Sequence, residues 1–105
     1  MAATPEKKVK QAVEAVLKQE DVYYFFPATH GYGRSGVPDI VGCVNGLFLG
    51  IECKANGGKP TALQVRELER IRQRNGVAVV VDETNLDMLL PLIRKLKTSI
   101  IKGAD

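Results

Sequence analysis

The sequence predicts a single α/β domain over residues 1–105, in which helices pack on one mixed β-sheet. Three observations lead to this expectation. The length of 105 residues suffices for one modest hydrophobic core. The composition, 45% hydrophobic and 26% charged, is ordinary for a globular protein. Helix-like and strand-like spacings of apolar residues follow one another in the order α-β-β-β-α-β-α, which is typical of a sheet covered by helices.

Capping and turn residues indicate where these elements begin and end. Thr4 before Pro5 is typical of a helix N-terminus, and Thr61 is a candidate cap for the second helix. Pro91 is expected to kink or break the last helix, because proline lacks an N–H group and clashes with the preceding turn. The expected elements are helices over about 5–19, 61–74 and 85–97, strands over 22–28 and, fully buried, 77–82, and a hairpin over 39–55.

The register of the hairpin determines where its charged residues lie. If Asn45 and Gly46 form a two-residue turn, residues that face each other have numbers summing to 91. Asp39 then faces Glu52, and alternation places Lys54 on the same side of the sheet. The opposite side is apolar and is expected to pack into the core; it contains Ile40, Gly42, Val44, Leu47, Leu49, Ile51 and Cys53.

Two carboxylates that face each other across a sheet repel, so this arrangement requires a cation. One interpretation is a charge cluster at the end of the sheet, in which Lys54 alone balances the acids. The other is a divalent metal site, because Mg²⁺ binds a few carboxylate oxygens and a carbonyl while it keeps several waters. With a lysine beside it, such a site has the groups needed to hydrolyse a phosphodiester. The residues alone leave both interpretations open.

Charge, cysteine content and hydropathy narrow the class of protein. The net charge of +3 mildly favours an anionic partner such as nucleic acid. Cys43 and Cys53 lack the further cysteines or histidines of a zinc site, so they are expected to be small buried residues in a reducing compartment. There is no secretion signal and no apolar run of the roughly 18 residues that span a bilayer, so a cytoplasmic protein without a membrane partner is expected.

The residues PD at 38–39 and ECK at 52–54 resemble the PD-(D/E)xK nuclease signature. The longer pattern GVPDI, NG and IECKANGGKPTALQ resembles the virus-type replication-repair nuclease (VRR-Nuc) domain, and the likeness runs from about residue 6 to 81. It implies a restriction-endonuclease-like α/β core, consistent with the element order. Short free-standing domains of this kind suggest a phage or mobile element, which implies the cytoplasm of a bacterial host.

The resemblance implies a role for each matching residue. Asp39 and Glu52 would bind Mg²⁺, for which Mn²⁺ can substitute, together with the backbone carbonyl of Cys53. Lys54 would position the nucleophilic water or stabilise charge on the phosphate. Gln64, in the helix after the ECK residues, would help to hold the active-site network.

The first helix contains two candidate acids. Glu6 matches the acidic residue of the family's first helix, and at 100° per residue it falls within the apolar arc of Val9 and Val13. Glu14 lies on the flank of that arc and stays an alternative. Local roles are open as well, because an acid is favourable at any helix N-terminus and Gln64 can form a purely local hydrogen bond.

Basic and aromatic residues outside the hairpin are candidate DNA contacts. Arg66, Arg70 and Arg74 recur every four residues on one face of the second helix, either as a solvated face or as a stripe that follows phosphates. The loop GYGRSG at residues 31–36 formally matches the G-x-G-x-x-G fingerprint of dinucleotide-binding proteins. A strand follows it instead of a helix, so no nucleotide cofactor is expected. The expected DNA contacts are Tyr32, Arg34, Lys59, Arg66 and Arg70.

Together these features predict a metal-dependent, structure-selective DNA endonuclease. A free-standing domain of this family is expected to act on branched DNA, with resolution of Holliday junctions by a homodimer as the leading activity. Part of the apolar stripe at 86–96 could form a dimer seam. Alternatives are a flap or replication-fork nuclease, an enzyme that degrades host DNA, a non-catalytic DNA-binding module on the same fold, and a structural basic protein.

Overall fold

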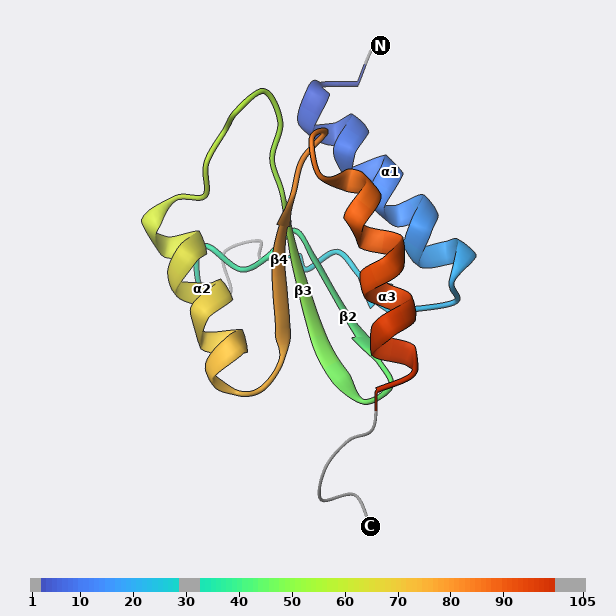
Figure 1. Ribbon diagram of the computed structural model, residues 1–105. Coiled ribbons are helices and arrows are strands. Elements are labelled where there is room, and N and C mark those ends of the chain that lie inside the picture. Colours follow the sequence, from blue (N-terminus) through green and yellow to red (C-terminus); the bar gives the residue numbers. More distant parts are fainter. Residues whose placement is uncertain (1–2, 29–32, 100–105) are drawn as a thin grey trace.

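The computed structural model, which describes residues 3–28 and 33–99, contains a mixed four-stranded sheet with helices on both faces (Figure 1). The elements are α1 (Pro5–Gln19), β1 (Tyr23–Phe25), β2 (Ile40–Val44), β3 (Leu47–Cys53), α2 (Ala62–Gln73), β4 (Val77–Val81), a 3-10 turn η1 (Leu86–Met88) and α3 (Leu89–Lys97). Helix α2 packs on one face of the sheet, and α1 and α3 pack on the other (Figure 1). The predicted α/β class and element order are confirmed, and both are compatible with a restriction-endonuclease-like core.

The strands lie in the order β1-β2-β3-β4, antiparallel from β1 to β3 and parallel between β3 and β4. The hairpin of β2 and β3 has the predicted register. Asn45 and Gly46 have φ angles of 53° and 80°, as a type I′ turn requires. Val44 pairs with Leu47, and the facing residue numbers sum to 91 along the hairpin. The start of β2 therefore lies beside the end of β3.

The apolar side of the hairpin packs into the core, as predicted. Ile51 and Cys53 are fully buried there against the layer formed by α1 and α3. Thr4 caps α1, because its Oγ1 accepts a hydrogen bond from Lys7 N at 3.1 Å. The core cluster comprises Val9, Val13, Leu17, Val22, Ile40, Val44, Leu49, Ile51, Cys53, Val81, Leu89, Ile93 and Leu96.

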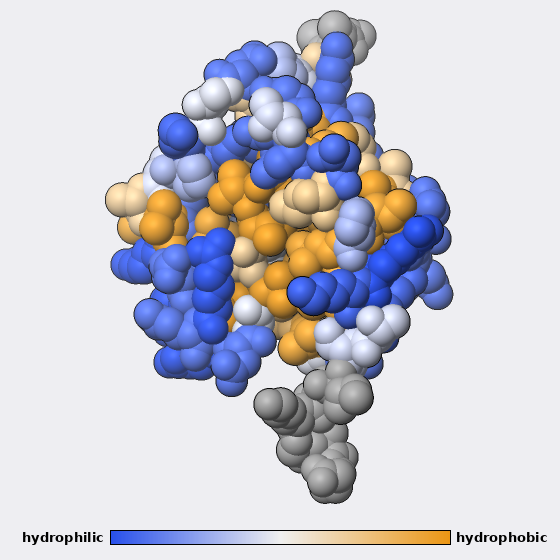
Figure 2. Space-filling model, in the orientation of Figure 1, coloured by the Kyte–Doolittle hydropathy of each residue, from blue (hydrophilic) through white to orange (hydrophobic). Residues whose placement is uncertain are grey.

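Both outer strands differ from the predictions. β1 ends at Phe25, short of the expected 22–28, because Phe25 is the last residue paired with β2 and Pro27 has no N–H to donate. β4 is not the fully buried strand that was expected: it is an edge strand, and Val79 and Val80 are only half-buried. Figure 2, in the view of Figure 1, shows an apolar region between α2 and the α1–α3 layer at the position of β4.

The helix expected over 85–97 is broken, but the break lies just before Pro91 and not at it. The segment is divided before the proline, into η1 and α3, and α3 begins at Leu89. Pro91 therefore lies in the first turn of α3, where backbone N–H groups have no acceptor within the helix. The apolar stripe contributes Leu89, Ile93 and Leu96 to the core.

The face of the sheet that carries α2 is covered only in part, because α2 contacts mainly β3 and β4. Beside the remaining half, Cys43, Tyr23, Phe25 and Phe48 are exposed. Cys43 is therefore not the buried residue that was expected, whereas Cys53 is buried. In the ranges described, no helix combines the length and apolar character needed to cross a membrane.

Candidate active site

The motif residues meet at one end of the sheet, where the hairpin ends lie beside the first turns of α1 (Figure 1). Asp39 directly precedes β2, Glu52 is near the end of β3, and Lys54 follows β3. Glu52 is only 2% exposed although glutamate is an ionisable side chain that is rarely buried, so its position is energetically unusual.

Each carboxylate of this cluster is paired with one lysine. Asp39 Oδ1 lies 3.4 Å from the Nζ of Lys10, and Asp39 Oδ2 accepts a hydrogen bond of 2.8 Å from the backbone N–H of Cys53. Glu52 Oε2 lies 3.6 Å from the Nζ of Lys54. The Cys53 contact holds Asp39 against the β3 backbone, so both acids are anchored on the same strand end.

The second oxygen of Glu52 has no partner. Within residues 3–28 and 33–99, Glu52 Oε1 is the one buried side-chain oxygen or nitrogen without a hydrogen bond. Burial, together with the charge of Asp39, raises the pKa of Glu52 to about 7, although Lys54 acts in the opposite direction. A buried, unpartnered carboxylate oxygen beside a second carboxylate is a donor set that fits a hard divalent cation.

The rest of a metal site would have to come from groups other than acidic or thiol side chains. In the described ranges, no cluster of three or more His, Cys, Asp or Glu side chains is placed to hold a metal. Burial raises the pKa of the Cys53 thiol to about 12, and the side chain belongs to the core. Cys53 can therefore contribute its backbone carbonyl to a metal, but not a thiolate at neutral pH.

Glu6 and Glu14 are placed very differently. Glu6 and Lys54 line one open polar pocket of about 430 Å³, and the charge of Glu6 contributes to the raised pKa of Glu52. Glu14 instead accepts a hydrogen bond of 2.6 Å from the hydroxyl of Tyr24 and lies 3.8 Å from Lys18. Of the two alternatives, Glu6 is the acid at the candidate site.

Gln64 has a local role in the structure. Thr61 Oγ1 accepts from Gln64 N at 3.2 Å, and Gln64 Oε1 accepts from Thr61 N at 2.9 Å. This reciprocal pair is a capping box at the start of α2. The participation of Gln64 in an active-site network stays a prediction.

Replacing Gln64 with alanine is expected to lower the free energy of unfolding by about 1 kcal/mol, because one of the two capping hydrogen bonds is lost. Gln64→Glu is the matched control, since glutamate forms the same capping box. Urea unfolding of the three proteins measures the effect. Equal destabilisation of both variants would contradict a capping role.

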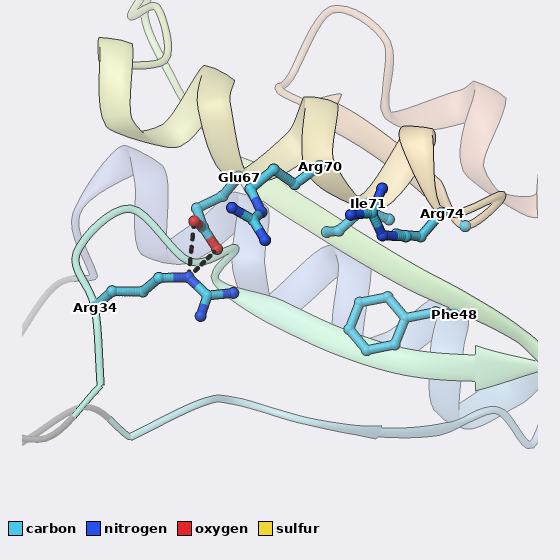
Figure 3. Close-up of a pocket in the computed structure, with 7 residues that line it drawn as sticks. Arg34, Phe48, Glu67, Arg70, Ile71 and Arg74 are labelled. Atoms are coloured by element: carbon cyan, nitrogen blue, oxygen red, sulfur yellow. Dashed lines mark hydrogen bonds and ion pairs between the residues drawn. The ribbon is translucent and has the colours of Figure 1, made fainter.

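The expected DNA contacts do not form one group. Arg34 donates from Nε to both carboxylate oxygens of Glu67, at 2.9 Å each, and links the segment before β2 to α2 (Figure 3). Lys59 lines the polar pocket that Glu6 and Lys54 also line, which is a different pocket from the cavities that Arg34 lines. Tyr32 lies outside the described residues. Arg66 is on the exposed surface of α2, 4.0 Å from Glu67.

Two residues near these sites, Lys10 and Glu67, were not predicted from the sequence. Lys10 lies one helical turn after Glu6, so the spacing that selected Glu6 also indicated Lys10. Glu67 is 4% exposed, and it shares a helical stripe with Leu68 and Ile71. The same periodicity could have identified Glu67 as a buried acid, but not its partner Arg34, which is 33 positions away.

Comparison with known proteins adds one relative. No protein-family model matches the chain. "Putative nuclease p44" of Acyrthosiphon pisum secondary endosymbiont phage 1 is 38% identical to it over 85 residues. The aligned segment covers 80% of this chain and 88% of the phage protein, so the similarity spans most of both.

Proposed function

We propose that this chain, which belongs to the same nuclease family as that phage relative, is a metal-dependent DNA endonuclease that hydrolyses phosphodiester bonds. The observation that carries this proposal is the buried Oε1 of Glu52, which has no hydrogen-bond partner and lies near the carboxylate of Asp39. The other oxygen of Glu52, Oε2, is paired with Lys54. The finer assignment, to the VRR-Nuc domain, is supported by the motif pattern and by the element order.

Asp39 and Glu52 would hold Mg²⁺ or Mn²⁺, with the backbone carbonyl of Cys53 as a third protein ligand. A metal bound there would supply a nucleophile at neutral pH and neutralise charge on the phosphate. The small number of protein ligands suits Mg²⁺, which keeps several waters. Lys10 and Lys54 balance the two acids without a metal, at 3.4 and 3.6 Å.

Lys54 is the candidate for a direct role in hydrolysis. Its side chain is 14% exposed and lines the polar pocket, and its Nζ lies 3.6 Å from Glu52 Oε2. From this position Lys54 would orient the attacking water or stabilise negative charge on the scissile phosphate. Glu6, across the pocket, would hold a water by hydrogen bonding.

The proposed substrate is branched DNA, with Holliday junctions as the leading candidate. A four-way junction presents two symmetric strands, and a two-fold homodimer would present two sites to them. Flap and replication-fork structures are the alternative substrates. The net charge of +3 and the exposed arginines of α2 favour a DNA partner in general without selecting its shape.

The test is cleavage of labelled junction, flap, fork, nicked and linear duplex DNA by the purified protein. With Mg²⁺ or Mn²⁺, we expect cleavage of branched DNA in preference to linear duplex, and no cleavage with EDTA. Failure to cut any substrate with either metal would overturn the enzyme proposal and leave a DNA-binding module. Sedimentation of the protein with and without a junction tests the homodimer.

A further inference from the structure

A second candidate site lies on the same side of the sheet as the active site, between α2 and the segment before β2. Two adjoining cavities, of about 340 and 510 Å³, share Arg34, Phe48, Glu67 and Ile71 as lining residues. The larger cavity has the size of a small-molecule site. We call the two together the Phe48 groove.

The floor of the Phe48 groove is apolar and includes an accessible aromatic ring. Phe48 is 48% exposed, an unusual state for a ring in a strand next to the core. Val41 and Phe25, the latter 50% exposed, also line the larger cavity, and Ile71 adds apolar surface from α2 above the ring (Figure 3). In Figure 3 the Phe48 ring faces the space beneath α2.

The rim of the groove is positively charged. Arg70 and Arg74 line the smaller cavity, and in the described ranges neither forms an ion pair with an acid. Glu67 is the one acid among the described residues that line the groove, and Arg34 Nε neutralises it from 2.9 Å. Figure 3 shows the side chains of Arg34, Arg70 and Arg74 around the space that Phe48 borders. An apolar floor with arginines at its rim favours a ligand that has both flat apolar surfaces and negative charge.

Unpaired nucleotides combine these two properties. We propose that the Phe48 groove binds an unpaired stretch of the DNA substrate, with a base stacked on Phe48 and phosphates bound by Arg70 and Arg74. This inference rests on the proposed nuclease function and deepens it: among the proposed substrates it favours flap and replication-fork structures, which have unpaired bases near the branch, over a fully paired four-way junction.

The position of the groove relative to the catalytic cluster fits this ligand. Phe48, Gly50 and Glu52 alternate along one side of β3, so Phe48 lies about 14 Å from Glu52 along the strand. Strand phosphates in duplex DNA are about 3.4 Å apart along the axis, so this length corresponds to about four nucleotides or fewer. A strand held in the groove would thus reach the candidate active site within a few nucleotides of the stacked base.

A second copy of the chain fits the groove less well. A two-fold contact through this surface would bring the groove arginines of both copies close together, and the groove offers them only Glu67, which Arg34 already binds. Nucleic acid supplies the missing negative charge.

The test measures binding in EDTA, where cleavage does not occur, to a labelled oligothymidine of about 12 nucleotides and to an abasic chain with the same number of phosphates. Phe48→Leu keeps an apolar side chain without a ring, and it is expected to weaken oligothymidine binding about tenfold and leave abasic binding unchanged.

Phe48→Trp is expected to keep the affinity for oligothymidine. Since the wild-type sequence contains no tryptophan, the introduced indole is the single tryptophan of the variant. Quenching of the fluorescence of this indole by DNA would report stacking directly. Arg70→Gln is expected to weaken binding of both chains and to lower the salt slope by about 0.7.

Two results would overturn the inference: equal oligothymidine binding by wild type and Phe48→Leu, or Phe48→Trp fluorescence that changes with protein concentration but not with DNA. The second result would identify a contact between copies. Thermal unfolding of each variant excludes a folding defect as the cause. Neither result depends on cleavage, so the nuclease proposal can fail or succeed separately.

Discussion

The variant Asp39→Asn is expected to cut branched DNA about a thousandfold more slowly than wild type, or slower still, and to remain folded. Loss of one carboxylate removes a ligand from the proposed metal site. A bound metal stabilises the transition state by several kcal/mol, and each loss of about 1.4 kcal/mol slows the reaction tenfold. Asparagine keeps an oxygen that can accept the hydrogen bond from Cys53 N, so the end of the hairpin should hold its shape.

The measurement is a single-turnover cleavage rate at saturating Mg²⁺, with circular dichroism as the check on folding. Asp21→Asn is a matched control, because Asp21 is exposed and has a φ of 54°, a conformation that asparagine tolerates. Unchanged cleavage by folded Asp39→Asn would show that Asp39 is not a metal ligand.

Glu52→Gln is expected to stabilise the metal-free protein above about pH 7, by about 3 kcal/mol, while it abolishes cleavage. The physical reason is the pKa of Glu52, about 7 in the folded protein against 4.5 ordinarily. A carboxyl group with a raised pKa favours the folded state fully below its unfolded pKa. That contribution is lost as the pH rises from about 4.5 through about 7, and the glutamine has no proton to lose.

Urea unfolding in EDTA between about pH 5 and 8 measures this difference. The wild-type free energy of unfolding should fall across that window more steeply than that of Glu52→Gln, and saturating Mg²⁺ should restore wild-type stability at pH 8. Glu69→Gln is the control, because Glu69 is exposed and only forms a surface ion pair with Arg72. Parallel pH profiles for wild type and Glu52→Gln would contradict the raised pKa.

Much of the candidate site could be predicted from the sequence because local rules govern it. The Asn45-Gly46 turn determines the hairpin register, and alternation then places Glu52 and Lys54 on one side. These features depend on residues near one another in the sequence. Glu6 was identified differently, by its match to the family's first helix and by its place within the apolar arc of that helix.

The features that escaped prediction depend on distant contacts. The pairing of Arg34 with Glu67 joins segments 33 positions apart, and nothing in either segment identifies the other. The exposure of Cys43 depends on how far α2 extends over the sheet, and the partial exposure of β4 depends on its place at the edge of the sheet. The expected helix over 85–97 is broken before Pro91 and not at it, because α3 begins at Leu89 and a proline is unfavourable only after the first turn of a helix.

The hairpin that carries Asp39 and Glu52 also has a consequence for folding. These carboxylates are thirteen positions apart, joined by a tight turn, so only a short loop closes when they meet. Loop-closure entropy is small for such a length, and contacts of low sequence separation form early. A cation could therefore bind as soon as the hairpin exists, before α2 and α3 have docked. We expect Mg²⁺ to accelerate refolding, in contrast to a metal site whose ligands come from opposite ends of a chain.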